Sequence, residues 1–133
     1  MNAVFADTFY FVARLNRHDQ HHVRTLAFSR DFRAHLLTTD WVLMEVADAL
    51  AESESRARIR EFIVLLRQSP ACEVVAASRD LLDRALGLYH QHADKEWTLT
   101  DCTSFVVMRE REITTALTAD HHFEQAGFVS LLK

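Results

Sequence analysis

Four acidic residues stand where they could act together on a phosphodiester. Asp7 directly follows a short apolar run, and Asp120 follows another such run within three residues of Leu117. Glu45 and Asp101 lie in segments that are otherwise largely apolar. Like charges that converge repel each other and raise each other's pKa, so such a cluster is costly without a cation. Mg²⁺ or Mn²⁺ prefers carboxylate and water oxygens, polarises a phosphoryl oxygen and lowers the pKa of a water, as phosphodiester hydrolysis requires.

Taken singly, each acid has a simpler interpretation. An aspartate after a strand is commonly a loop or N-cap residue, and Asp101 could cap its own helix and complement the helix dipole. Glu45 is harder to explain in this way, because Val42 and Val46 beside it belong to an apolar stripe. The pattern of all four together is what favours a shared site.

The apolar pattern predicts short strands that alternate with longer helices. The expected strands cover residues 3–6, 35–38, 72–76, 115–118 and 128–132. The expected helices cover residues 8–15, 20–34, 40–50, 56–68, 78–92, a segment that starts at Thr100 or Asp101, and 121–126. This alternation predicts an α/β fold around a mainly parallel sheet, and such sheets bind ligands at the carboxyl ends of their strands. Asp7 and Asp120 would both lie on that edge.

The composition is that of one ordinary globular domain. The chain has 133 residues, of which 49% are hydrophobic and 26% charged, with two glycines and one proline. So few turn residues disfavour linkers and a sandwich of many short strands. No segment has the pattern of a signal peptide or a membrane span. We therefore expect a single domain over residues 1–133, located in the cytoplasm, with Cys72 and Cys102 as buried free thiols.

The charge balance limits how this chain could bind nucleic acid. There are 15 Lys and Arg residues against 19 Asp and Glu, a formal net charge of −4. This balance excludes a strongly basic module that binds nucleic acid by bulk charge alone. It does not exclude an acidic site that performs chemistry on nucleic acid.

The blocks around the four acids resemble those of a PIN domain, the fold of toxin nucleases in bacterial VapBC-type toxin–antitoxin pairs and their stand-alone relatives. The similar segments, in chain order, are VFADTFYFVARLN, TTDWVLMEVADAL, DKEWTLTDCTSFVVMRE and TALTADHHFEQAGF. The resemblance implies a PIN-like three-layer α/β/α sandwich with a central, mainly parallel sheet of four to five strands. It also implies a metal-dependent endoribonuclease with Mg²⁺ or Mn²⁺ as cofactor. The implied partners are the RNA substrate, an antitoxin protein and a second copy in a homodimer.

Carried over residue by residue, the resemblance also assigns roles within the site. The catalytic and metal-binding residues would be Asp7, Glu45, Asp101 and Asp120, the first and third binding the metal directly. The supporting residues, which would hydrogen-bond the carboxylates or metal-bound waters, would be Thr8, Thr98, Thr100 and Asp94. The candidates for RNA contacts are Arg14, Lys95 and His121, with His122 as the alternative to His121.

Several alternatives stay open at this point. A PIN-like scaffold could bind RNA or a protein without cutting, although the presence of all four acids disfavours it. A phosphohydrolase of small molecules would need the same acids. His18 and His22 have the spacing of zinc ligands if their segment is helical, but no third ligand is evident. The amphipathic segments 20–34 and 56–68 could offer an apolar groove to a partner helix.

Overall fold

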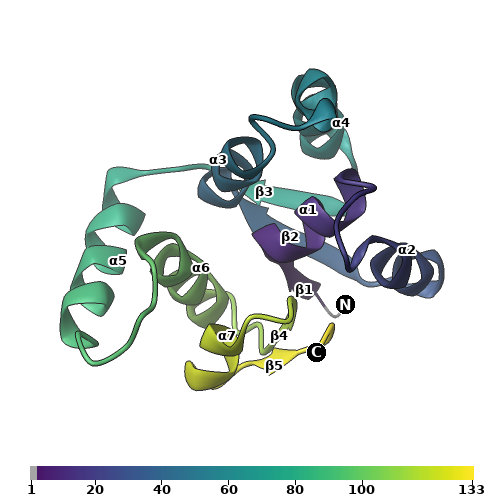
Figure 1. The fold of residues 1–133 in the computed structure, drawn as a ribbon. Coiled ribbons are helices and arrows are strands. Elements are labelled where there is room, and N and C mark those ends of the chain that lie inside the picture. The colour runs from purple at the N-terminus through teal and green to yellow at the C-terminus, as the bar shows by residue number, and fades with distance from the viewer. Residues whose placement is uncertain (1–2) are drawn as a thin grey trace.

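The central element of the molecule is a sheet of five parallel strands. The computed structural model describes residues 3–133. The strands are β1 (Ala3–Ala6), β2 (His35–Thr39), β3 (Cys72–Val75), β4 (Thr115–Leu117) and β5 (Val129–Ser130). They pair in the order β3-β2-β1-β4-β5, and every pairing is parallel (Figure 1). The first strand of the chain therefore lies in the middle, between β2 and β4.

Helices connect the strands and cover the sheet, as the alternating pattern predicted. In the described part of the chain they are α1 (Thr8–Leu15), α2 (His22–Asp31), α3 (Asp40–Ala49), α4 (Ile59–Gln68), α5 (Arg79–Gln91), α6 (Leu99–Glu110) and α7 (His121–Gln125), with a 3₁₀ turn η1 (Glu54–Arg58) before α4. Figure 1 shows α5 and α6 on one side of the sheet and α2 and α4 on the other. The fold is thus the three-layer α/β/α sandwich that was expected. Among the residues described, no helix is both long and apolar enough to span a membrane.

Some predicted boundaries were wrong by a few residues. The expected helix over 20–34 is shorter, because only His22–Asp31 is helical. The expected strand over 128–132 is reduced to Val129–Ser130. The sixth helix begins earlier than expected: its N-cap is Thr98, whose hydroxyl accepts a hydrogen bond from the Asp101 N–H at 3.0 Å. A capping box over these two residues, rather than a cap at Thr100 or Asp101, therefore sets the start of α6.

A cluster of buried aromatic rings ties together the elements that carry the acids. Phe5 of β1, Phe105 of α6 and Phe123 of α7 are fully buried. The ring of Phe123 lies 6.3 Å from that of Phe5 and 5.0 Å, edge to face, from that of Phe105. Such pairs contribute roughly 0.5–1.5 kcal/mol each beyond the area that they bury. Because the three rings lie within four residues of Asp7, Asp101 and Asp120, packing of this cluster holds those three acids near one another.

The two thiols behave as the sequence indicated. Cys72 and Cys102 are buried and free. Burial raises the pKa of each thiol to about 11. Both side chains are therefore protonated at neutral pH and serve as small apolar groups.

Candidate active site

The structure brings the four acids to one edge of the sheet. Asp7 directly follows β1, Asp120 lies three residues after β4, and Glu45 is in α3, which begins where β2 ends. Because these three strands are parallel neighbours, their carboxyl ends meet. Asp101, in the first turn of α6, joins them: its charge and that of Glu45 raise the pKa of Asp7, and Asp120 acts likewise on Asp101.

Asp7 is the most deeply placed of the four acids. Its side chain is buried, and Oδ2 accepts a hydrogen bond from the Thr118 hydroxyl at 2.8 Å. Burial raises the pKa of Asp7 from 3.8 to about 7, and the charges of Asp101 and Glu45 add to this effect. Hydrogen bonds from the Thr118 hydroxyl and the Thr8 backbone oppose it only in part. The ionised form of Asp7 is therefore one that a nearby cation would stabilise strongly.

Asp101 combines the two interpretations that the sequence left open. Its Oδ2 accepts a hydrogen bond from the backbone N–H of Thr98 at 3.0 Å, which completes the capping box of α6. The same oxygen lies 2.9 Å from Nδ1 of His122. Burial raises the pKa of Asp101, while the contacts with Thr98 and His122 lower it. This acid thus caps its helix and also belongs to the acidic cluster.

Glu45 and Asp120 form the more open part of the cluster. The Thr8 hydroxyl donates a hydrogen bond to Oε1 of Glu45, which ties α1 to α3. Asp120 caps α7 by accepting the His122 N–H at 2.9 Å, and its own N–H donates to the Thr118 hydroxyl at 3.0 Å. The Asp120 side chain remains 34% exposed. Solvent and ligands can therefore reach the cluster from the side of Asp120.

The four carboxylates lack a lysine or arginine partner. Within residues 3–133, none of the four forms an ion pair with Lys or Arg, and the groups that can carry positive charge within 4 Å are His122, beside Asp101 and Asp120, and His121, beside Asp120. The donors are carboxylate oxygens, one of them buried with a strongly raised pKa. This donor set fits a hard divalent cation such as Mg²⁺ or Mn²⁺.

The predicted supporting residues occupy different positions. Thr8 contacts the cluster through its hydroxyl, whereas Thr98 contacts Asp101 through its backbone N–H. The Thr100 carbonyl accepts a hydrogen bond from the Thr103 hydroxyl at 2.6 Å, a contact within α6. Asp94 is exposed and pairs with Lys95 at 3.2 Å, a contact that lowers its pKa. The structure therefore brings Thr8 and Thr98 to the acids and places Asp94 on the surface.

The predicted RNA-contact residues are also spread over the surface. The guanidinium of Arg14 lies over the ring of Tyr10, with 5.6 Å between its Cζ and the ring centre. His121 is exposed, with Nδ1 3.7 Å from Oδ1 of Asp120. Lys95 lines a cavity between α5 and the start of α6. Of these candidates, His121 lies directly beside a site acid.

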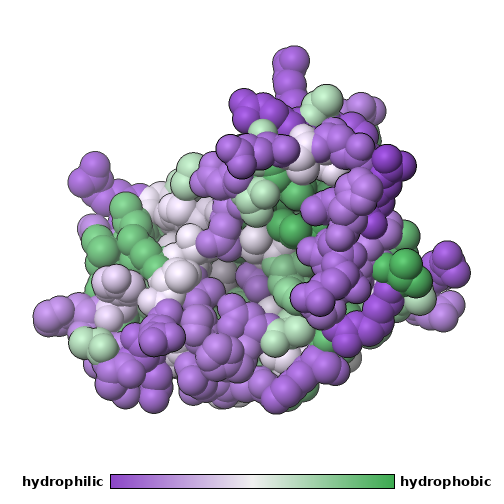
Figure 2. Space-filling model, in the orientation of Figure 1, coloured by the Kyte–Doolittle hydropathy of each residue, from purple (hydrophilic) through white to green (hydrophobic). Residues whose placement is uncertain are grey.

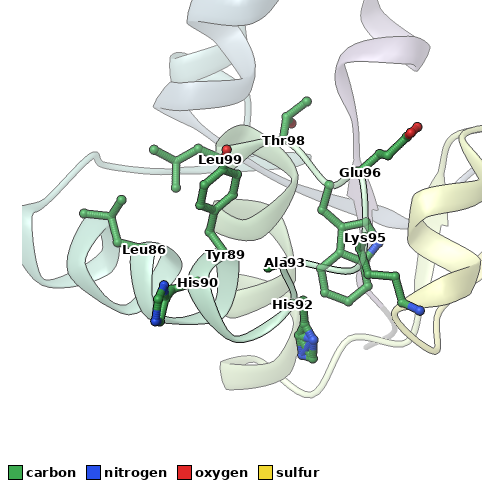
Figure 3. A pocket seen from close by; sticks show the side chains of 10 residues that line it. Leu86, Tyr89, His90, His92, Ala93, Lys95, Glu96, Thr98 and Leu99 are labelled. Carbon is green, nitrogen blue, oxygen red and sulfur yellow. The ribbon is translucent and has the colours of Figure 1, made fainter.

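The cavity that Lys95 lines lies between α5 and the segment that leads into α6 (Figure 3). It has a volume of about 780 Å³, and its lining includes Tyr89, His92, Trp97 and Thr98. Tyr89 is 48% exposed, whereas Trp97 is 5% exposed and donates its indole N–H to Gln125 at 3.0 Å. One lining residue, Thr98, also contacts Asp101 through its backbone N–H. Trp97 thus forms a wall of this cavity and Tyr89 an accessible aromatic face.

Two residues of the site were missed or left undecided by the sequence analysis. Thr118 bridges Asp7 and the Asp120 backbone, and a hydroxyl residue at the end of a strand two positions before an acid is the signal that could have found it. His122 faces the cluster, whereas its neighbour His121 faces solvent. Sequence spacing alone does not show which of two adjacent histidines faces inward.

The structure does not support a zinc site formed by His18 and His22. Residues 16–21 are not helical, so the spacing of His18 and His22 is not that of ligands on one helix face. His22 Nδ1 lies 2.7 Å from the Ala13 carbonyl, and His18 Nε2 lies 3.3 Å from Glu54. The two imidazoles therefore have separate partners.

Comparisons with known proteins agree with this architecture. The family model of the PIN domain matches residues 4–129. The 23S rRNA-specific endonuclease VapC20 of Mycobacterium tuberculosis is 28% identical over 128 residues, which cover 96% of this chain and 97% of that protein. The crystal structure of VapC20 from that species, described as a sarcin–ricin loop cleaving toxin, matches with a TM-score of 0.87 and 26% identity, over 96% and 98% of the two chains. FitAcB from Neisseria gonorrhoeae shares the fold, with a TM-score of 0.62 and 15% identity over 96% and 94%.

Proposed function

Because the chain belongs to the PIN domain family, we propose that it is a metal-dependent endoribonuclease and the toxin of a toxin–antitoxin pair. The observation that carries this proposal is the convergence of Asp7, Glu45, Asp101 and Asp120 at one sheet edge, without a Lys or Arg partner within residues 3–133. RNA as the substrate is supported by VapC20, whose name describes it as a 23S rRNA-specific endonuclease.

The residues of the chain have distinct tasks in this proposal. Asp7 and Asp101 would bind the cation directly, and Glu45 and Asp120 directly or through water. When bound, Mg²⁺ or Mn²⁺ supplies Lewis acidity toward a phosphoryl oxygen and a nearby water. The side chains around the acids hold them in place: Thr8 orients Glu45, and Thr118 links Asp7 to the backbone of Asp120. Such supporting hydrogen bonds fix the carboxylates before the metal arrives.

RNA would lie across the acidic edge and into the cavity beside α5. Lys95 would contact a phosphate, and the half-exposed ring of Tyr89 would stack on a base. Trp97 is too deeply buried to stack on a base and instead supports the cavity wall. His121, exposed beside Asp120, would contact a phosphate on the other side of the cluster. Phosphate contacts in this proposal come from single side chains, because the chain as a whole is acidic.

The decisive experiment is a cleavage assay on 23S rRNA and on a short sarcin–ricin stem-loop. We expect cleavage with Mg²⁺ or Mn²⁺, none after chelation, and a loss of at least about 100-fold in Asp101→Asn. The matched control is Asp80→Asn, which changes an exposed carboxylate of α5 and should cleave like the original protein. Undiminished cleavage by purified Asp101→Asn would contradict the proposal. An unaltered protein that binds RNA but neither Mn²⁺ nor Mg²⁺ would instead support the non-cleaving scaffold.

The antitoxin would bind a groove between α3 and α4. This groove has a volume of about 610 Å³, with Ile59, Ile63 and Val64 along it and Arg56 and Arg60 also in its lining. Figure 2 shows apolar surface in this region, between α3 and α4. An apolar floor beside arginines fits an amphipathic segment with acidic flanks. Val64→Asp, at a position 43% exposed, should weaken antitoxin binding without affecting RNA cleavage.

A further inference from the structure

One imidazole stands among the proposed oxygen ligands. His122, the second residue of α7, has a side chain that is only 15% exposed. Its Nδ1 lies 2.9 Å from Oδ2 of Asp101 and 3.5 Å from Oδ1 of Asp120. Four carboxylates alone would make a site of oxygen ligands. A nitrogen atom at these distances changes the chemistry that the site offers to a cation.

The distances around His122 are compatible with neighbouring ligands on one ion. In an octahedral site with bonds of about 2.1 Å, adjacent ligand atoms lie roughly 3 Å apart. Nδ1 of His122 lies 2.9 Å from Oδ2 of Asp101, which is also a hydrogen-bond distance, and 3.5 Å from Oδ1 of Asp120. Asp120, His121 and His122 present ligand atoms that all lie within 4.8 Å of one another, so His122 and Asp120 are close enough to share a cation. Asp101 lies beside the same nitrogen.

The position of His122 is fixed by its neighbours in the chain. The adjacent Phe123 is fully buried against Phe5 and Phe105. The backbone N–H of His122 donates to Oδ1 of Asp120, so the acid and the imidazole are held together by the cap of α7. A ligand that is already in place loses little conformational freedom when the metal binds.

We propose that His122 is a nitrogen ligand of the cation held by the acidic cluster, and that it makes the site prefer a first-row transition ion, for which Mn²⁺ is the probe, over Mg²⁺. Mg²⁺ strongly prefers oxygen ligands, whereas imidazole nitrogen binds first-row transition ions more tightly. Binding through Nδ1 requires the neutral imidazole tautomer with its proton on Nε2, so the contact between Nδ1 and Asp101 gives way to the cation. The inference rests on the proposed function only in that it uses the same acidic cluster.

The test is pulsed electron paramagnetic resonance on metal-stripped protein titrated with Mn²⁺. We expect a nitrogen hyperfine coupling from a directly bound imidazole in the unaltered protein and in His121→Gln, and its loss in His122→Gln. Mg²⁺ competition in the same samples should show the ratio of Mg²⁺ to Mn²⁺ dissociation constants falling about tenfold in His122→Gln. In His122→Asp, an oxygen replaces the nitrogen, so Mn²⁺ binding should persist without nitrogen coupling and with improved Mg²⁺ affinity.

Each result separates this inference from the proposed function. Mn²⁺ that binds the unaltered protein without nitrogen coupling would overturn the inference and leave the metal-dependent nuclease standing. Coupling that persists in His122→Gln and disappears in His121→Gln would show that His121 is the nitrogen ligand, and would also overturn the inference. Absence of Mn²⁺ binding would overturn the inference, and absence of both Mn²⁺ and Mg²⁺ binding would overturn the proposed function as well. Far-UV circular dichroism of each variant confirms that the fold is retained before the spectra are compared.

Discussion

Acidic side chains at the two ends of the parallel sheet have opposite environments. At the amino end, where the first residues of β1, β2 and β4 line a shallow cavity, Glu73 accepts hydrogen bonds from Arg111 at 2.7 and 3.0 Å. These contacts lower the pKa of Glu73. At the carboxyl end, burial and neighbouring acids raise the pKa of Asp7 and that of Asp101. The carboxylate at the amino end is paired with an arginine, whereas the carboxylates at the carboxyl end have no lysine or arginine partner among the described residues.

This contrast separates an acid that serves the structure from acids that await a ligand. The pair between Glu73 and Arg111 is complete, so a cation from solvent gains little there. The acidic cluster destabilises the metal-free protein, because buried carboxylates repel each other and are poorly solvated. Natural proteins tolerate such a cost mainly at functional sites. Each prediction below weakens or sharpens this difference between the two ends.

The largest effect is expected from placing a lysine side chain within the acidic cluster. Glu45→Lys places an ammonium beside Asp7, much as Arg111 stands beside Glu73. We expect RNA cleavage to fall at least about 100-fold, because the ammonium competes with the divalent metal. Mn²⁺ affinity, measured by calorimetry, should fall with it. The matched change at the other end, Glu73→Gln, should leave cleavage unchanged; a loss there would break the comparison.

The second prediction concerns pH and the free energy of unfolding of metal-free protein. The pKa of Asp7 is about 7 in the folded protein, against an ordinary 3.8. Because the folded-state pKa is raised, the contribution of the Asp7 carboxyl to the free energy of unfolding is fully present below pH 4 and is lost as pH rises toward 7. Asn does not ionise, so Asp7→Asn does not lose this stability. The free energy of unfolding of Asp7→Asn, relative to that of the original protein, should therefore rise between pH 4 and 7.5, by roughly 4 kcal/mol at most.

Urea unfolding in the presence of a chelator measures this difference. Glu73→Gln serves as the control with the opposite sign, because a lowered pKa gives stability that is lost as the pH falls. If the difference in free energy of unfolding between Asp7→Asn and the original protein did not change with pH, Asp7 would not be the buried carboxyl with a raised pKa.

The third prediction is that metal stabilises the protein through the acidic end alone. At a free Mn²⁺ concentration 100 times the dissociation constant, binding to the folded state should add about 2.7 kcal/mol to the free energy of unfolding. The gain should disappear in Asp7→Asn and remain in Glu73→Gln. Thermal unfolding at several Mn²⁺ concentrations measures it; an equal gain in all three proteins would indicate that the metal binds elsewhere.

The smallest effect is expected at the amino end itself. The side chains of Glu73 and Arg111 are 47% and 40% exposed, so solvent screens their attraction. Glu73→Gln should cost less than about 1 kcal/mol at neutral pH, and the effect should shrink with added salt. A double-mutant cycle with Arg111→Gln isolates the pair. A coupling of several kcal/mol would mean that this end is also built around a costly buried charge.

Most of the fold could be predicted from the sequence because its signals are local. The apolar runs at 3–6 and 115–118 mark strands that occur almost as expected, and α1 covers the predicted residues 8–15. The start of α6 was predicted at Thr100 or Asp101, because both residue types can open a helix. The reciprocal bonds between Thr98 and Asp101 instead set the start at Leu99. Strand order likewise depends on pairing between distant segments, which local patterns do not encode.

The acids could be recognised from the sequence, but their surroundings could not. Spacing and family resemblance singled out Asp7 and Asp120, and the topology brings them together. The direction of each neighbouring side chain depends on packing. Phe123 enters the core and so turns His122 toward Asp101, while His121 points to solvent. Which imidazole joins the site is therefore a property of the tertiary structure.

The bond between Thr118 and Asp7 joins residues 111 positions apart in the chain. It follows from the parallel pairing of β1 with β4, which comes much later in the chain. A growing chain therefore presents Asp7 to solvent long before its partner strand and the hydroxyl that holds it have left the ribosome. A chain interrupted before residue 115 retains Asp7, Glu45 and Asp101 but cannot assemble them. The acidic cluster can therefore assemble only after β4 has been synthesised.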